Sequence, residues 1–148
     1  MKKIAIAALP RRFGSGYPAP FDEPVRQRSR CALGEAAGLT DFGVNVLQLP
    51  PGVWSSQRHW HSREDEFVWV LEGEVVLVTD DGEEILRAGE CAGFKGGEAN
   101  GHHFQNRSDR PALLLEVGSR HDDDVTDYSD IDMRWSGPRP THKDGRPY

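Results

Sequence analysis

The chain has 148 residues, a length that fits one domain and leaves little room for a second. Its 16 glycines and 10 prolines, with only 36% hydrophobic residues, favour a turn-rich fold over a helical one. The formal net charge is -6 and no block is rich in Lys or Arg, which argues against nucleic acid as a partner because phosphate binding needs a basic surface. A small anionic ligand stays compatible with this charge, because one metal ion can invert the charge of a local site.

The first 41 residues are expected to form an N-terminal arm. Residues 3–9 alternate weakly between Ile and Ala, which predicts a first short strand. Residues 10–30 contain four prolines and two glycines, so we expect an extended segment there rather than a helix. Residues 31–40 have room for one helical turn, and their two glycines argue against more.

From about residue 42 the pattern becomes that of short β-strands. These runs are rich in β-branched and aromatic residues, and Gly, Pro, Asp or Asn separates most of them. Asp80-Asp81-Gly82 is typical of a tight hairpin turn. Strands at this spacing predict an antiparallel sandwich or barrel. The expected strands are 44–49, 55–61, 66–72, 74–79, 83–87, 90–94, 102–106 and 112–117.

The segment 66–72 is apolar on both of its faces. On a strand, Val68 and Val70 point one way while Phe67, Trp69 and Leu71 point the other. A strand with one face in water would not show this pattern. The second face must therefore be covered, either by the N-terminal arm or by another subunit, and we expect a homodimer.

Residues 119–148 are more polar than the preceding strands. The run Asp122-Asp123-Asp124 is interpreted as a solvated face, and Tyr128 and Trp135 as isolated anchors. We expect this segment to be either an ordered strap over the barrel or a mobile tail, with no core of its own. The whole chain, 1–148, is then one domain, with its barrel core at about 42–118.

The sequence favours a cytoplasmic protein without a membrane partner. No stretch approaches the ~20 apolar residues that a membrane span needs. Lys2 and Lys3 precede an apolar run, but Pro10 ends it before it reaches the length of a signal peptide. Cys31 and Cys91 form no CxxC pair, so we expect both to be reduced and at least partly buried.

A cluster of metal-ligand residue types begins at His59. Side chains two apart on a strand share a face, so His59 and His61 point together. Glu66 opens the next strand, and pairing of the two strands would return its carboxylate to the same face. His102 follows a glycine-rich turn and offers a fourth ligand. Two imidazoles and a carboxylate on one face predict a divalent metal site with open positions.

These residues carry a resemblance to the cupin superfamily. The first motif is His59-x-His61-x4-Glu66-x6-Gly73, and the second starts at Gly89 and ends with His102-x3-Asn106. The resemblance covers about residues 42–118. It implies an all-β double-stranded β-helix, or jelly-roll barrel, with one divalent metal held by His59, His61, Glu66 and His102.

Three departures from the motif loosen the alignment of the loop before His102. Lys95 stands where the second motif usually has Pro, four residues separate Gly97 from His102, and six separate Gly52 from His59. His103 is therefore a rival ligand. We prefer His102, because only His102 has the spacing from Asn106 that the motif requires.

The predicted site suits Mn, Fe, Co, Ni, Cu or Zn, and the ligand types do not choose among them. By resemblance, small cupins act as sugar or sugar-phosphate isomerases, as lyases, or as dioxygenases of small organic acids. We therefore expect a metalloenzyme acting on a small polar or anionic molecule, and no residue is assigned as general acid or base. Lys95 and Arg58 are either anion-binding residues or ordinary surface charges. The alternative is a non-catalytic cupin that binds or senses a small ligand.

Overall fold

The computed structural model describes residues 3–148. It contains one short α-helix, two 3-10 helices and thirteen strands, which confirms the all-β class. The helices are η1 (Ile6–Ala8), η2 (Glu23–Val25) and α1 (Leu33–Ala37). The strands are β1 (Arg12–Phe13), β2 (Ser29–Ala32), β3 (Phe42–Leu49), β4 (His59–His61), β5 (Glu66–Glu72), β6 (Glu74–Thr79), β7 (Gly82–Arg87), β8 (Cys91–Phe94), β9 (His103–Gln105), β10 (Ala112–Ser119), β11 (Thr126–Tyr128), β12 (Arg134–Trp135) and β13 (Pro140–Thr141).

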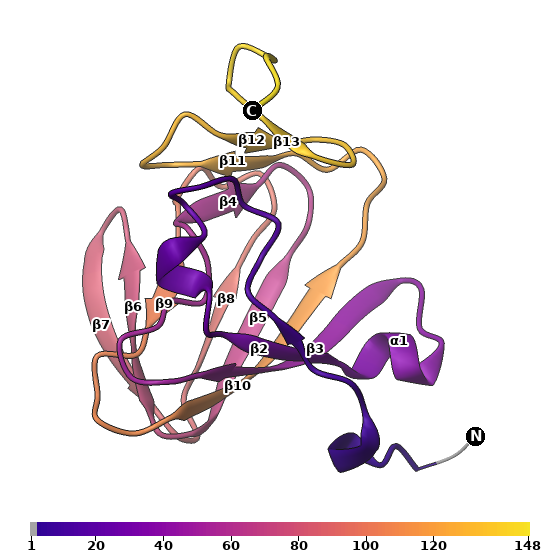
Figure 1. Cartoon of the computed structure of the whole chain (residues 1–148), viewed down its shortest axis with the longest axis vertical. Coiled ribbons are helices and arrows are strands. Elements are labelled where there is room, and N and C mark those ends of the chain that lie inside the picture. The colour runs from indigo at the N-terminus through magenta and orange to yellow at the C-terminus, as the bar shows by residue number, and fades with distance from the viewer. Residues whose placement is uncertain (1–2) are drawn as a thin grey trace.

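Three antiparallel sheets build the molecule (Figure 1). The largest has the strand order β1-β2-β3-β10-β5-β8, and the order β7-β6-β9 forms the second. These two sheets face each other across the core, as a jelly roll requires. The third sheet, β13-β12-β11-β4, lies across one end of the barrel, at the top of Figure 1.

The barrel interior changes from apolar to polar toward the end that the third sheet covers. Leu47, Leu114 and Val70 lie side by side across β3, β10 and β5, and all three are fully buried. Four residues further along each strand, toward the strap, the row of inward-facing residues is Gly43, Gly118 and Glu66. Because the large apolar side chains stop before this row, the barrel mouth has room for polar chemistry.

The N-terminal arm differs from the sequence prediction at its start. Residues 3–9 do not form a strand, since Ile6–Ala8 is a turn of 3-10 helix with no buried residue. A weak alternation of Ile and Ala has nothing to pair with there, because in Figure 1 the segment points away from the barrel. The extended interpretation of 10–30 holds apart from the short helix Glu23–Val25, and the single helical turn expected in 31–40 is α1.

The strand predicted at 55–61 is wrong in its first half, because only His59–His61 is a strand. Polar groups of this segment are divided between β9, whose Phe104 carbonyl accepts from the Ser55 N–H at 2.8 Å, and the N-terminal arm, so no continuous strand ladder forms. The Arg28 guanidinium donates to the carbonyl of Ser55, and the Gln57 amide donates to the carbonyl of Phe21 at 2.8 Å. The other predicted barrel strands occur in the structure with ends that differ by at most two residues.

The outer face of β5 is not covered by the arm. Phe67, Trp69 and Leu71 are 40%, 44% and 39% exposed, so the expectation that the N-terminal arm covers this face is wrong. Cys91 pairs with Trp69 and shares its outward face, which explains why Cys91 is exposed although the sequence suggested partial burial. Cys31 is buried as expected.

The C-terminal segment crosses the barrel end as a strap, defined here as residues 119–148 with strands β11 to β13. β11 pairs with β4, so the strap is hydrogen-bonded to the strand that carries two of the predicted ligands. Tyr128 and Met133 of the strap are buried, and the ring of Tyr17 from the arm packs edge-on against Tyr128 at 5.5 Å between centroids. No helix in the described part of the chain is long and apolar enough to span a membrane.

Candidate metal centre

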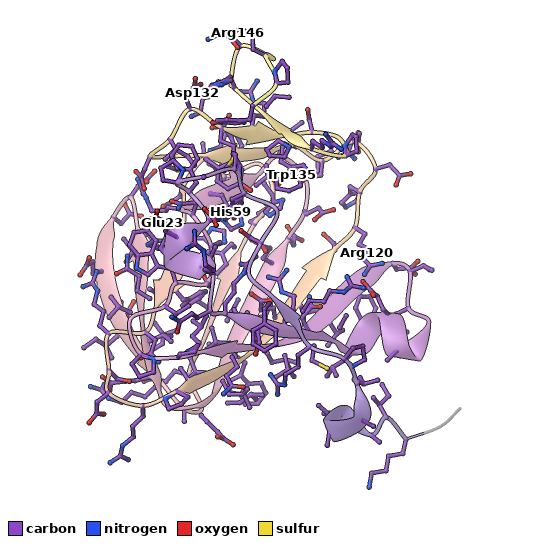
Figure 2. The ribbon with its side chains drawn as sticks, in the orientation of Figure 1. Glu23, His59, Arg120, Asp132, Trp135 and Arg146 are labelled. Carbon is purple, nitrogen blue, oxygen red and sulfur yellow. The ribbon has the colours of Figure 1, made fainter. Side chains whose placement is uncertain are left out.

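β4 lies between two other segments at the barrel mouth. On one side β11 pairs with it, placing Tyr128 opposite His59. On the other side the backbones of His59 and His102 exchange two hydrogen bonds, at 2.9 and 3.2 Å. Figure 2 shows His59 just beneath the strap, at the end of the barrel. A three-residue strand thus joins two histidines to a third that is distant in sequence.

One carboxylate oxygen of Glu66 is the point on which three imidazoles converge. The Nε2 atoms of the three rings lie 2.9 Å (His102), 3.5 Å (His61) and 3.7 Å (His59) from its Oε2. Ligands of one metal ion at ~2.1 Å are expected to be about 3 Å apart when adjacent. Ligand atoms of His59, His61 and Glu66 also lie within 4.8 Å of one another. His102 joins this group through its contact with Glu66.

Hydrogen bonds to Nδ1 leave the Nε2 atoms of two histidines available. Nδ1 of His59 donates to the carbonyl of Gln57 at 2.9 Å, and Nδ1 of His61 donates to Asp124 Oδ2 at 2.6 Å. A neutral imidazole that donates from Nδ1 carries its lone pair on Nε2, the nitrogen that faces Glu66. Both rings are thus held in the tautomer that a divalent metal needs.

The ring of His102 is held differently. It stacks on Phe94, with ring centroids 3.5 Å apart and planes 2° from parallel. Its Nδ1 is buried and has no hydrogen-bond partner within residues 3–148. Stacking and the backbone bridge to His59 therefore orient this ring.

His103, the rival ligand, lies in a different environment. Its Nδ1 donates to the carbonyl of Ser56 at 2.9 Å, and its Nε2 accepts from the Gln105 amide at 2.9 Å. Its ring packs edge-on against Trp54. With both nitrogens engaged there, His103 is not part of the cluster around Glu66.

Asp124 is a site residue that the sequence analysis missed. Its Oδ1 accepts hydrogen bonds from Ser62 Oγ and from the backbone N–H groups of Arg63 and Glu64, while Oδ2 accepts from His61. The side chain is only 9% exposed, so the interpretation of Asp122–Asp124 as a solvated run is wrong at this position. No sequence signal marks it, since it is 63 residues away from His61.

The electrostatics of the cluster favour a cation at its centre. Burial lowers the pKa of His59 to about 4, and the neighbouring His102 and His61 add to this although Glu66 opposes it. Burial alone would raise the pKa of Glu66, but the His102 hydrogen bond and the charges of the histidines outweigh it and lower that pKa to about 2. At neutral pH the cluster therefore presents a neutral His59 and an ionised Glu66, as metal binding requires.

A cavity of about 230 Å³ opens beside the cluster, between β6, β8 and the loop before His102. Lys95 lines it, whereas Arg58 does not. Arg58 is paired instead with Asp80 and Asp130, which leaves its guanidinium without a role in the cavity. Of the two cations considered from the sequence, only Lys95 thus stands beside the cluster.

Residues 45–118 match the family model described as a cupin domain, which is half of the chain. The chain belongs to the cupin family. This assignment agrees with the jelly-roll barrel and with the position of the histidine cluster at its mouth. No match was found among curated proteins.

Two solved structures are similar to this cupin in both sequence and fold. A cupin-superfamily sugar phosphate isomerase from Silicibacter pomeroyi is 46% identical, with a TM-score of 0.94 over 99% of this chain and 96% of that one. A protein from Acidithiobacillus ferrooxidans, named provisionally as a sugar phosphate isomerase, is 32% identical, with a TM-score of 0.69 over 73% and 69% of the two chains. A polyketide cyclase from Streptomyces resistomycificus, 22% identical with a TM-score of 0.64 over 80% and 79% of the chains, shares the fold.

Proposed function

We propose that this cupin is a metal-dependent enzyme acting on a small hydroxylated molecule, and that its reaction is the isomerisation of a sugar or sugar phosphate. One observation carries the metal: three imidazole Nε2 atoms converge on one carboxylate oxygen of Glu66, at 2.9 to 3.7 Å. The names of the similar proteins from Silicibacter pomeroyi and Acidithiobacillus ferrooxidans support the substrate class.

The proposed ligands are His59, His61, Glu66 and His102. Histidine nitrogens with one carboxylate suit Mn, Fe, Co, Ni, Cu or Zn, so the donor set fits a divalent transition metal without selecting one. When bound, such an ion polarises a carbonyl or hydroxyl oxygen as a Lewis acid. The remaining tasks fall to the protein's own side chains.

Glu64 is the side chain placed to move a proton. It lines the cavity beside the cluster, and its Oε1 is held by the backbone N–H of His121 at 2.9 Å. Isomerisation of a sugar moves a proton between adjacent carbons, which requires a base beside the carbon next to the oxygen that the metal would hold. We assign that base to the carboxylate of Glu64, while Phe94, stacked on His102, shields one side of the cluster from water.

Elemental analysis tests the metal centre. The protein is purified without a metal-affinity tag, beside the double variant His59→Ala/His61→Ala and the control His103→Ala. We expect near-stoichiometric metal in wild type and in His103→Ala, and none in the double variant. Wild type that carries no metal and takes none up would refute the centre.

Turnover decides between an enzyme and a binding module. Metal-loaded protein is screened against aldose and ketose phosphates and the corresponding free sugars. Turnover that is lost in His61→Ala supports an isomerase. Tight ligand binding without turnover supports the alternative, a non-catalytic cupin that holds a small ligand at its metal.

We also propose that the chain forms a homodimer through the outer face of its largest sheet. Phe42, Phe67, Trp69 and Leu71 all lie on that face, and each is about 40% exposed. Apolar side chains gathered on one face are typical of a protein interface. Light scattering at micromolar concentration is expected to give the dimer mass for wild type and a monomer for Trp69→Lys. A monomer mass for wild type would contradict this proposal.

Two further expectations stay proposals. The first is a single domain over 1–148, with the arm at 1–41, the barrel core at about 42–118 and the strap at 119–148. The second is a cytoplasmic location, which the two free thiols, Cys31 and Cys91, support. Fractionation of the native host with an antibody to this protein would test the location.

A further inference from the structure

Two cavities meet at the predicted metal centre. Glu64 and Glu66 line both of them. The first is the cavity of about 230 Å³ beside Lys95, and the second, of about 190 Å³, lies over the inner face of β3, β10 and β5. A molecule held at the cluster therefore has two directions in which to extend.

The two cavities differ in charge. Apart from the shared glutamates, the first contains Lys95 against Asp81 and Glu98, which makes its wall acidic. The second contains two arginines, Arg30 and Arg120, against one carboxylate, Glu116. With the shared glutamates counted, both walls are acidic, but the second opposes an anionic group of a ligand less than the first and offers it two guanidinium groups.

Glycines form the floor of the second cavity. Gly43, Gly118 and Glu66 lie opposite one another on three adjacent strands. A Cβ at Gly43 would be 3.8 Å from Nε and Nη2 of Arg120, and a Cβ at Gly118 would be 3.8 Å from Cγ of Glu66. The Arg120 guanidinium therefore lies over a floor that leads directly to the cluster, about two strand spacings or roughly 10 Å from the strand of Glu66.

The two arginines differ in how they are held. Within residues 3–148 the Arg120 side chain makes no hydrogen bond or ion pair, and Figure 2 shows it just past the end of β10. Arg30 is fixed by Glu116, with Nη2 3.0 Å from Oε2, and its buried Nε has no acceptor in the same residues. One guanidinium is thus anchored on the cavity wall and the other is free to close on a ligand.

We propose that Arg120, with Arg30 beside it, is the subsite for the phosphate group of the substrate. This inference rests on the proposed function for the identity of the substrate, a sugar phosphate whose oxygens face the metal. The phosphate lies over Gly118, beside the Arg120 guanidinium that covers Gly43. Guanidinium groups suit this role, because their planar donors match the oxygens of phosphate. Arg120 then determines specificity for phosphorylated over free sugars.

Inorganic phosphate is the probe that tests the subsite. It is titrated calorimetrically into the full chain as purified, with the metal content measured in the same samples. We expect Arg120→Met to weaken phosphate binding about tenfold or more, as for loss of a hydrogen bond to a charged group, and Lys95→Met to leave it unchanged. The proposal would be overturned if wild type bound no phosphate or if Arg120→Met bound it as tightly as wild type. It would also be overturned if only Lys95→Met lost affinity for phosphate.

Two further variants keep the test decisive if Arg120→Met folds poorly. Gly43→Val fills the floor of the cavity without changing a charge and is expected to weaken phosphate binding as well. Arg120→Lys keeps the charge but loses the paired donors, so we expect an intermediate affinity. Wild-type affinity in Gly43→Val would overturn the proposal.

The failure of this inference is distinguishable from failure of the proposed function. A protein without metal, or one that turns over no sugar, refutes the proposed function, whereas the phosphate titration still decides the role of Arg120. For a sugar phosphate that is turned over, Arg120→Met is expected to raise KM about tenfold while KM for the free sugar stays unchanged. An equal change for both sugars would count against a phosphate subsite.

Discussion

Replacement of Asp124 by Asn is expected to disable the proposed metal centre, although Asp124 is not among the four ligands proposed for it. The carboxylate uses both oxygens: Oδ1 accepts from Ser62, Arg63 and Glu64, and Oδ2 accepts from His61 Nδ1. Asn has one oxygen, and the three donors around Oδ1 hold it there. Its amide then faces His61 and donates to Nδ1, so the ring proton of His61 moves to Nε2, the nitrogen that the metal needs.

The magnitude follows from two separate losses. Removing the group that orients a metal-bound histidine lowers metal affinity by roughly 10- to 100-fold. Loss of the charged acceptor also removes about 1.5–3 kcal/mol of the free energy of unfolding, since hydrogen bonds to charged groups contribute about that much. Burial would raise the pKa of Asp124, but the hydrogen bonds from His61 and from the backbone N–H groups of Arg63 and Glu64 together outweigh it and lower that pKa. The carboxylate is therefore charged at neutral pH.

Competition with a chelating dye measures the affinity for Zn, and urea unfolding of the metal-free protein measures stability. Asp123→Asn is the matched control, because Asp123 is 66% exposed and contacts only Arg63 among the charged residues described. Nitrogen NMR of the metal-free variants reports which nitrogen of His61 carries the proton. Wild-type affinity in Asp124→Asn, or an equal loss in Asp123→Asn, would refute the reasoning.

Two further predictions concern catalysis and acid stability. Glu64→Gln is expected to keep its metal and to lower kcat at least about 100-fold by loss of the base, which steady-state kinetics on a turned-over sugar would show. A wild-type kcat in this variant would mean that another group transfers the proton. The lowered pKa of His59, about 4 against an ordinary 6.5, means that the unfolded chain binds more protons between these pH values. The free energy of unfolding of the metal-free protein should therefore fall by about 3 kcal/mol as the pH drops from 6.5 to 4. His59→Gln should flatten this dependence in urea titrations at several pH values, and an unchanged slope would point to another group.

The barrel and the cluster were predictable because they depend on local rules. Alternation along 66–72 and the hairpin signal at Asp80–Gly82 follow from strand geometry, and two histidines two residues apart must share a face. Glu66 returns to His59 and His61 as expected, but the predicted pairing of their two strands is wrong, because β4 pairs with β11 while β5 pairs with β10 and β8. Motif spacing supplied His102, which the structure places against Glu66 at 2.9 Å.

The residues that the sequence did not reveal come from contacts between distant segments. Asp124 reaches His61 across 63 residues, and no pattern of period two or 3.6 encodes such a pairing. Arg120 is brought beside Gly43 from just past the end of β10, where its backbone N–H donates to the carbonyl of Asp41 at 3.2 Å. Cys91 was misjudged because its burial depends on which face of β8 points outward, and that is set by pairing with Trp69.

The strap therefore belongs to the chemistry of the barrel mouth and not only to its covering. β4 has three residues, too few to be held by its own packing, and it owes its position to β11 on one side and to His102 on the other. The strap supplies Asp124 to one histidine of β4 and sets Tyr128 against the other, with ring centroids 5.7 Å apart. Because the proposed metal would bind only the folded arrangement of these segments, its binding free energy would also stabilise the docked strap. A substitution that loosens the docked strap, such as Asp124→Asn, is therefore expected to weaken the affinity for the proposed metal as well.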